Sequence, residues 1–276
     1  MSNLASSEAG LDTASRTSGK RSMPIVLARL LFLLAILAIW QGAVATGLAD
    51  AAFVSTPASV AESLWLLFRD GGVISSIGTT LLEIMIAFAA SVVFGIASAV
   101  VLDRNDWLNR IVSPFLTAFN SMPRIALGPL FILWFGIGIA SKVVLAFSLG
   151  YFIMLLSTLG GLKNVDRDLL LMSRLFGASE LRLFRHVRLP WALPGIFAGL
   201  KLTLIYCSAG AVIGEMIAAK SGLGVLLQSF SGRFDVAGVL ALILIVALLV
   251  MVLTSLMDLV ERRFLEWSRG STDVPG

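Results

Sequence analysis

The chain has 276 residues, of which 58% are hydrophobic and 14% charged, and its formal net charge is +4. A soluble domain carries about 25% charged residues, and an apolar excess of this size cannot be hidden inside one globule. The composition excludes an ordinary soluble protein, a disordered chain and, with Cys207 as the only cysteine, a disulfide scaffold.

Six apolar stretches are long enough to cross a bilayer, which takes about 20 helical residues. Backbone groups in lipid must be satisfied within their own segment, so we expect helices. The stretches lie at 24–47, 77–102, 111–135, 141–162, 190–218 and 236–260. The sequence therefore predicts an all-α, polytopic membrane protein with about six transmembrane helices. The first stretch also has the make-up of a cleaved signal peptide, and that alternative stays open.

The distribution of basic residues predicts the orientation. Most of the 21 Lys and Arg residues lie near the two ends of the chain or in the loops around 103–110 and 163–189. Such loops stay in the cytoplasm, so we expect both termini there and no nucleic acid as a partner. Residues 1–22 are expected to be a disordered tail, 23–265 a transmembrane domain and 266–276 a second tail.

Two segments on the opposite side have helical character. Residues 56–69 begin with Pro57 at a favourable helix start and have capping-box spacing from Ser59 to Glu62. Their apolar residues share one face, which predicts an amphipathic helix. Residues 219–235 predict a glycine turn and a short helix that dips back toward the bundle.

The stretch 163–190 predicts two short helices joined by a tight turn. Asn164 or Asp166 can cap the first helix, and Gly177 supplies the permissive backbone that ends it. Ser179 can cap the second helix, which runs up to the next span. A basic loop lying at lipid headgroups would have a similar composition, and charge alone leaves that alternative open.

The spacing of this loop resembles a motif of a known family. Gly177, nine residues, Val187, one residue and Leu189-Pro190 are similar to the G-x9-I-x-L-P end of the EAA loop. That loop is typical of permease subunits of binding-protein-dependent ABC importers. The resemblance extends over roughly 55–265, in the nitrate, sulfonate and taurine branch. It includes Pro123, Ala126, Pro129-Leu130, the stretch 134–138, Gly214-Glu215 and Gly222-Leu223-Gly224.

The loop departs from the family pattern at its start. Where the family has Glu-Ala-Ala, this chain has Leu171-Met172-Ser173, so a glutamate available to a basic group on the ATPase is missing. Asp168, nearly one turn earlier, is the candidate replacement.

The resemblance implies a MetI-like permease fold in a bacterial inner membrane. Its implied partners, besides lipid, are two copies of an ATPase subunit, an extracytoplasmic solute-binding protein and a second permease copy in a homodimer. ATP and Mg would be bound by the ATPase, and no cofactor by this chain. The helix pair would dock in a groove of the ATPase and transmit its closure. The residues implied in this coupling are Asp168, Leu175, Phe176, Gly177, Ala178, Ser179, Val187, Leu189 and Pro190.

The sequence gives no sign of chemistry carried out by this chain. It contains no G-x-x-x-x-G-K-[ST] phosphate loop, and its single histidine, His186, excludes an H-E-x-x-H zinc motif. We therefore expect no catalytic, cofactor-binding or metal site.

Glu83, Arg124, Lys201 and Glu215 fall inside the predicted spans, where a charge costs about 2.5–3.5 kcal/mol on insertion scales. Either these residues line a polar path, or each of them escapes the lipid in its own way. In the second case Glu83 and Glu215 reach the outer interface, Lys201 snorkels toward the cytoplasm and Arg124 pairs with a carboxylate. We favour the second case for Glu83 and Lys201, and leave both open for Arg124 and Glu215.

The third span contains Pro114, Pro123 and Pro129, and internal prolines kink a helix. Broken helices at membrane depth are tolerated where they are buried in protein or border water. We therefore expect the translocation path beside 121–130. The candidate path residues are Pro123, Arg124, Pro129 and Glu215, with Arg124 as the attractor of an anionic solute.

The fifth span carries a stripe of small residues, which lets two helices approach closely. The stripe serves either packing within the chain or a contact with a second copy or the path. Its members are Gly195, Gly199, Thr203, Cys207, Gly210 and Gly214.

These features predict the permease of an ATP-driven importer for a small anionic or polar organic solute. Sulfonates, taurine, nitrate and a pyrimidine precursor remain open. A self-sufficient secondary transporter or channel driven by an ion gradient explains the hydropathy equally well, but not the loop spacing. A membrane-embedded enzyme lacks a catalytic constellation.

Overall fold

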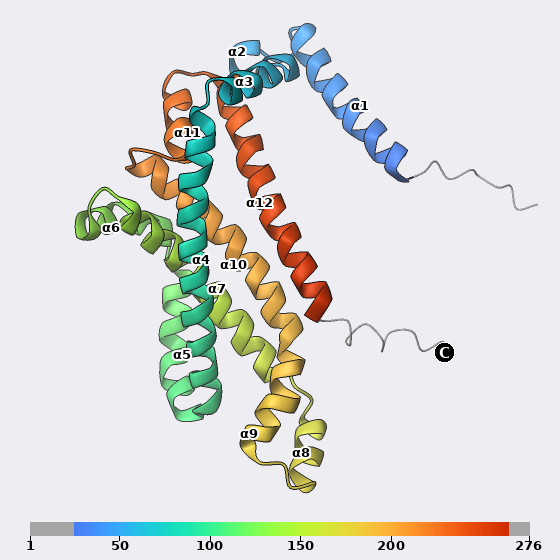
Figure 1. Cartoon of the computed structure of the whole chain (residues 1–276), viewed down its shortest axis with the longest axis vertical. Coiled ribbons are helices and arrows are strands. Elements are labelled where there is room, and N and C mark those ends of the chain that lie inside the picture. The colour runs from blue at the N-terminus through green and yellow to red at the C-terminus, as the bar shows by residue number, and fades with distance from the viewer. Residues whose placement is uncertain (1–24, 265–276) are drawn as a thin grey trace, which may run out of the picture. The chain divides into compact units, whose positions relative to one another are not determined.

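The computed structural model describes residues 25–264, and these form helices joined by short connections (Figure 1). The chain divides into two units, 1–50 and 51–276. The first contains α1 (Ile25–Ala45). The second contains α2 (Ala51–Val54), α3 (Pro57–Arg69), α4 (Gly72–Arg104), α5 (Asp106–Ser121), η1 (Arg124–Leu127), α6 (Gly128–Phe135), α7 (Ile139–Lys163), α8 (Arg167–Leu175), α9 (Glu180–Leu183), η2 (Phe184–Arg188), α10 (Leu189–Ile217), α11 (Leu223–Gly232) and α12 (Val236–Phe264). The expected tails at 1–22 and 266–276 lie outside the described residues.

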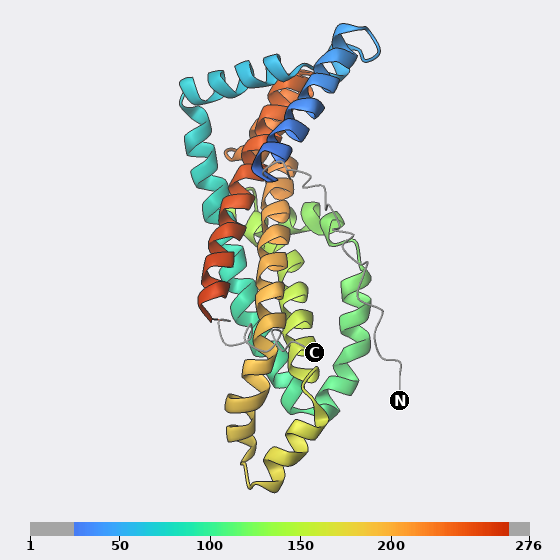
Figure 2. The same cartoon turned by 90° about the vertical axis from the view of Figure 1, so that its right-hand side faces the viewer.

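Four long helices, α4, α7, α10 and α12, form the body of the second unit and match four predicted spans (Figures 1 and 2). Helix α7 packs most extensively against α4 and α10, and α12 packs against α10, α11 and α3. With α1, they make five helices in residues 25–264 that are long and apolar enough to cross a membrane. The bent pair α5 and η1–α6 raises this number to six, which confirms the predicted fold class.

The third predicted span, 111–135, is a broken helix, and only one of its three prolines breaks it. The two parts of the span meet at 82°. Met122 has extended backbone because the following Pro123 disfavours the helical conformation in the residue before it. Pro114 lies inside α5 without ending it. Pro129 lies in the first turn of α6, where its missing N–H costs nothing. The expected kink at Pro129 is therefore wrong, because this proline lies at a helix start, whereas Pro114 lies within a continuous helix.

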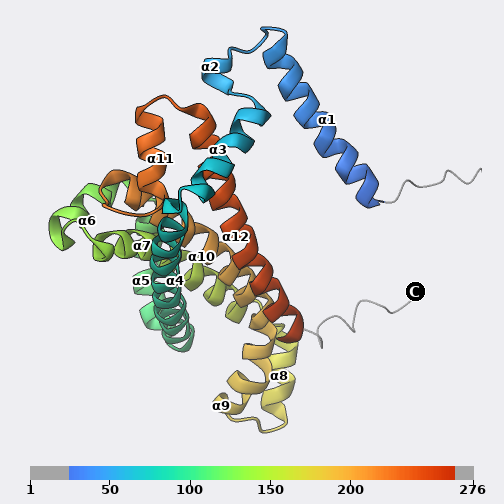
Figure 3. The same ribbon diagram turned by 45° about the horizontal axis from the view of Figure 1, so that its top comes forward.

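The shorter helices α3 and α11 lie at the end of the second unit that is opposite α8 and α9 (Figure 3). Helix α3 confirms the amphipathic helix predicted at 56–69. Its N-cap is Thr56, whose side chain accepts a hydrogen bond from the Ser59 N–H at 3.1 Å. The predicted capping box with Ser59 as the cap and Glu62 as its partner is therefore not the cap of this helix. Helix α11 confirms the short helix predicted within 219–235.

The small residues of α10 lie against α7 of the same chain. A Cβ added at Gly210 would lie 2.7 Å from the Cα of Ala146, closer than real Cβ atoms come. Side chains of ordinary size would force the two helices apart. The glycines of the stripe that face α7 in this way are Gly195, Gly199, Gly210 and Gly214, and Thr203 and Cys207 lie against Gly150 of α7.

Candidate functional site

The segment 167–188, here called the elbow, protrudes from one end of the second unit (Figures 1 and 2). Its first helix, α8, begins at a capped start, where the Asp166 side chain accepts a hydrogen bond from the Asp168 N–H at 2.8 Å. Of the two residues expected as the cap, Asp166 is the one used. The Asp168 side chain is exposed.

The turn of the elbow is a Schellman motif. The Gly177 N–H donates to the Arg174 carbonyl at 2.9 Å, and the Ala178 N–H donates to the Ser173 carbonyl at 3.1 Å. This motif needs left-handed backbone, which Gly177 provides with a φ of +77°. Arg174 and Glu180 also form an exposed ion pair across the turn at 3.1 Å. The predicted end of the first helix at Gly177 is confirmed.

The second limb of the elbow, which consists of α9 and η2, is continuous with α10. Ser179 occupies the N-cap position, but its side chain makes no capping hydrogen bond, so the predicted cap is wrong. The chain passes from α9 through η2, a wide turn of π-helix, directly into α10. Leu189 and Pro190 lie in the first turn of α10. Pro190 has no N–H, and its ring crowds the carbonyl four residues earlier. A wide turn accommodates this without breaking the helix.

The tip of the elbow exposes large apolar side chains. Leu175 is 79% exposed and Phe176 86% exposed. Leu171 and Met172, which replace the usual start of the family loop, are exposed as well. A cavity of about 310 Å³ between the two limbs is lined by Ser173, Phe176, Ala178, Arg182, Leu183, His186 and Val187.

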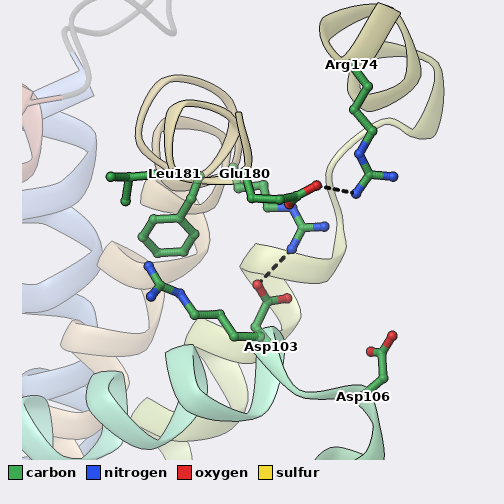
Figure 4. A pocket seen from close by; sticks show the side chains of 8 residues that line it. Asp103, Asp106, Arg174, Glu180 and Leu181 are labelled. Carbon is green, nitrogen blue, oxygen red and sulfur yellow. Dashed lines mark hydrogen bonds and ion pairs between the residues drawn. The ribbon is translucent and has the colours of Figure 1, made fainter. Parts of the chain in front are cut away.

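The second limb is attached to the end of α4 (Figure 4). Arg188 donates to Asp103 at 3.0 Å, and the Asp103 side chain is only 5% exposed. The Arg104 guanidinium lies over the Phe184 ring, 4.8 Å from its centre. These contacts border a cavity of about 430 Å³. Sequence reasoning missed this attachment because the partners are 85 residues apart along the chain.

Three ionisable side chains are buried between α4, α7 and α10. Glu83 forms an ion pair with Lys142, and their side chains are 0% and 5% exposed. Glu215, 1% exposed, lies within electrostatic reach of both. The expectation that Glu83 and Glu215 reach the outer interface is therefore wrong. Lys142 was missed, because it lies at the boundary of a predicted span and was counted with the outer basic residues.

Glu215 holds the beginning of α11. Its Oε2 accepts from the Gly224 N–H at 2.7 Å and its Oε1 from the Thr80 hydroxyl at 2.8 Å, while Thr80 Oγ1 accepts from the Leu223 N–H at 2.9 Å. The carboxylate thus satisfies N–H groups at the positive end of a helix. A Cβ at Gly222 or Gly224 would collide with Glu215. The Gly-Glu and Gly-Leu-Gly motifs of the sequence therefore form one structural unit.

Arg124 lies at the break between α5 and α6 and reaches across to α7. Its guanidinium donates to the Ser148 carbonyl at 2.7 Å and to Asn120 Oδ1 at 2.8 Å, and it covers the Phe152 ring at 4.7 Å. Within residues 25–264 it forms no ion pair, so the expected carboxylate partner is wrong. A carbonyl, an amide and an aromatic face take its place.

The four candidate path residues separate into two environments. Pro123 and Pro129 are exposed at the break, with Arg124 half-buried between them. Glu215 is buried, and both of its carboxylate oxygens are engaged.

Lys201 of α10 forms ion pairs with two residues of α12. Its Nζ lies 2.5 Å from a carboxylate oxygen of Asp258, and it also pairs with Glu261. The sequence predicted a lysine that snorkels toward the cytoplasm, and the two partners that α12 supplies were missed.

Most of this chain is similar in sequence to known proteins. Residues 91–266 match the family described as binding-protein-dependent transport system inner membrane component. The riboflavin transport system permease protein RibX of Chloroflexus aurantiacus is 31% identical over 235 residues, which cover 85% of this chain and 88% of that protein. The taurine transport system permease protein TauC of Escherichia coli K12 is 30% identical over 237 residues, covering 84% and 86%.

A solved structure supports the same assignment. An inward-facing conformation of the MetNI methionine ABC transporter superposes with a TM-score of 0.61 at 25% identity, over 72% of this chain and 96% of that one. The resemblance of the loop and the MetI-like fold are thus confirmed. The chain belongs to the inner membrane components of binding-protein-dependent transport systems and is the permease of an ABC importer.

Proposed function

We propose that this permease imports a small polar or anionic organic solute, and that the elbow is where a separate ATPase drives it. The tip of the elbow carries this proposal. Leu175 and Phe176 are held outward by a rigid left-handed turn, on a limb that continues into α10. Exposed apolar groups of this size are typical of a binding surface. A groove on the ATPase that receives them would remove them from water.

The orientation follows from this assignment. ATP is hydrolysed in the cytoplasm, so the elbow lies there, between the fourth and fifth spans. With six spans, both termini then lie in the cytoplasm too. Arg182 and Arg185 on the exposed side of the elbow agree with the rule that basic loops stay inside. Insertion of the elbow at lipid headgroups is the alternative for the same residues.

The partners of the chain follow from its family. We propose a homodimer of this permease, two ATPase subunits that bind ATP and Mg, and a solute-binding protein on the outer side. Each permease copy would present one elbow to one ATPase. A carboxylate at the start of α8 would meet a basic group of the ATPase, and Asp168 is exposed at that position.

Two long helices connect the elbow with the rest of the bundle. The first is α10, which continues its second limb without a break. The second is α4, held by the Asp103–Arg188 ion pair and by Arg104 on Phe184. In its half farther from the elbow, α4 carries Thr80, which together with Glu215 holds the start of α11, an arrangement here called the clamp. A movement of the elbow would thus reach the outer end of the bundle through packed helices.

We place the solute path at the break that carries Pro123, Arg124 and Pro129, and assign Glu215 to holding α11. A backbone break at membrane depth needs protein or water around it. Arg124 offers a positive charge there. The relatives are named for riboflavin and for taurine, so we infer a polar organic solute and leave its identity to the binding protein. An ion-driven secondary transporter would have no use for the elbow.

Replacement of Gly177 tests the elbow. No atom lies within 4 Å of a Cβ added there, so any effect comes from the backbone. A left-handed conformation costs an ordinary residue about 1–2 kcal/mol, and more for a β-branched one. We expect Gly177→Val to abolish uptake and co-purification of the ATPase while the protein still inserts into membranes. Gly177→Asn, which tolerates this conformation, is the matched control and should keep both. Normal uptake with Gly177→Val would refute the role of the elbow.

The Asp103–Arg188 pair can be tested by charge reversal. We expect Asp103→Arg and Arg188→Asp each to lower ATP-driven uptake about tenfold, because each leaves two like charges together, and the double variant to recover most of it. Uptake and ATPase activity are measured in proteoliposomes, and co-purification of the ATPase should stay unchanged in all three. If the double variant were no better than the worse single one, the pair would not transmit movement.

Arg124 is tested by uptake kinetics. Loss of a charge-assisted hydrogen bond costs about 1.5–3 kcal/mol, so Arg124→Gln should raise KM or lower the maximal rate for an anionic solute by about tenfold or more. Arg124→Lys keeps the charge and should retain part of the activity. If KM and rate were both unchanged in Arg124→Gln, Arg124 would not belong to the path.

A further inference from the structure

Helix α5 presents three different sides, of which one packs into the second unit. Leu108, Val112 and Leu116 contact a buried cluster formed by α4 and α7. The Phe119 ring lies 6.5 Å from the Phe152 ring of α7. These four residues follow helical spacing and define the inner side of α5.

A second side of α5 is apolar and exposed. It consists of Trp107, Ile111, Pro114, Phe115 and Ala118. Side chains of this kind are suited to lipid.

The third side contains only polar residues. At about 100° per residue, they fall together between the inner and the apolar sides. All are exposed except Asn109, which is half-buried. They are Asp106, Asn109, Arg110, Ser113, Thr117, Asn120 and Ser121, here called the polar side. It leads to Arg124, which bonds to Asn120 at 2.8 Å.

The polar side extends to the middle of the bundle. Helix α5 has 16 residues, which corresponds to about 24 Å of helix. It starts at the end of α4 that contacts the elbow. At its other end it lies next to Phe152, and Arg124 bonds to Ser148, both near the middle of α7. A row of exposed polar groups therefore runs along α5 from the end of α4 near the elbow to the middle of α7.

Lipid cannot be the neighbour of this surface, because polar and charged groups facing acyl chains are costly. A dry contact with a second copy is also unfavourable. A two-fold contact brings the same patch of both copies together, and with Arg110 and Arg124 against only Asp106 it would set two net positive patches against each other. Arg110 forms no ion pair within residues 25–264, and Arg124 bonds only to uncharged groups there. Water satisfies all of these groups.

We propose that the polar side of α5 is one wall of a water-filled passage that leads from the cytoplasm to Arg124. This inference rests on the proposed transport function and specifies where the solute leaves. The wall offers hydroxyl and amide groups between two guanidinium charges, with one carboxylate, Asp106, at the mouth. Such a wall accepts a hydrated solute that bears negative charge.

Cysteine labelling tests the passage. The single native cysteine is buried and is first removed as Cys207→Ala. Ser113→Cys, Thr117→Cys and Ser121→Cys then sample the polar side, and Ile111→Cys, Phe115→Cys and Ala118→Cys sample the apolar side of the same helix. Inside-out vesicles containing the full complex are treated with 2-sulfonatoethyl methanethiosulfonate, which reacts with thiolates and does not cross membranes. Because thiolates form in water, we expect the polar-side cysteines to react at least about tenfold faster.

The controls separate the outcomes. Equal rates on the two sides would overturn the passage. Polar-side cysteines that resist labelling but form disulfides between two copies on mild oxidation would show a dry interface and would also overturn it. Uptake that needs no ATP would refute the proposed function without changing the labelling pattern, so the two failures can be told apart.

Discussion

A polar group inside a bilayer must find a polar partner or water, and this constraint shapes the second unit. Glu83 and Lys142 neutralise each other between α4 and α7. Glu215 uses its carboxylate to satisfy the first N–H groups of α11. Each of these groups would be costly alone in hydrocarbon, so together they fix how four helices meet. The clamp turns a short apolar helix into a firm part of the bundle.

Under the proposed coupling the elbow would meet a different requirement, because it would have to transmit movement as a rigid body outside the spans. Gly177 sets its angle through a conformation that other residues avoid. The wide turn before Pro190 lets the second limb run into α10 without a hinge. The ion pair of Arg188 joins the same limb to α4. Movement of the tip would therefore have two routes into the membrane, and one of them ends at the clamp on α11.

Local patterns predicted much of this molecule, and distant pairings did not follow from them. Hydropathy located α4, α7, α10 and α12, because each contains an apolar stretch long enough to cross a membrane. Glycine spacing located the turn at Gly177, because a Schellman motif lies within a few residues. The pairing of Glu83 with Lys142 depends on residues from two helices, so Glu83 was wrongly placed at the interface. The break at Pro123 was expected as one of several kinks. Which proline would break the helix depended on its position, since Pro129 falls where a helix can start.

The central claim is that ATP hydrolysis on another subunit drives solute through this bundle. Its most direct measurement is uptake into proteoliposomes that contain the purified permease, its ATPase and its solute-binding protein, with the solute that this protein retains. The account predicts accumulation only with ATP, and none with an imposed proton or sodium gradient alone. Accumulation driven by an ion gradient with the ATPase left out would contradict it.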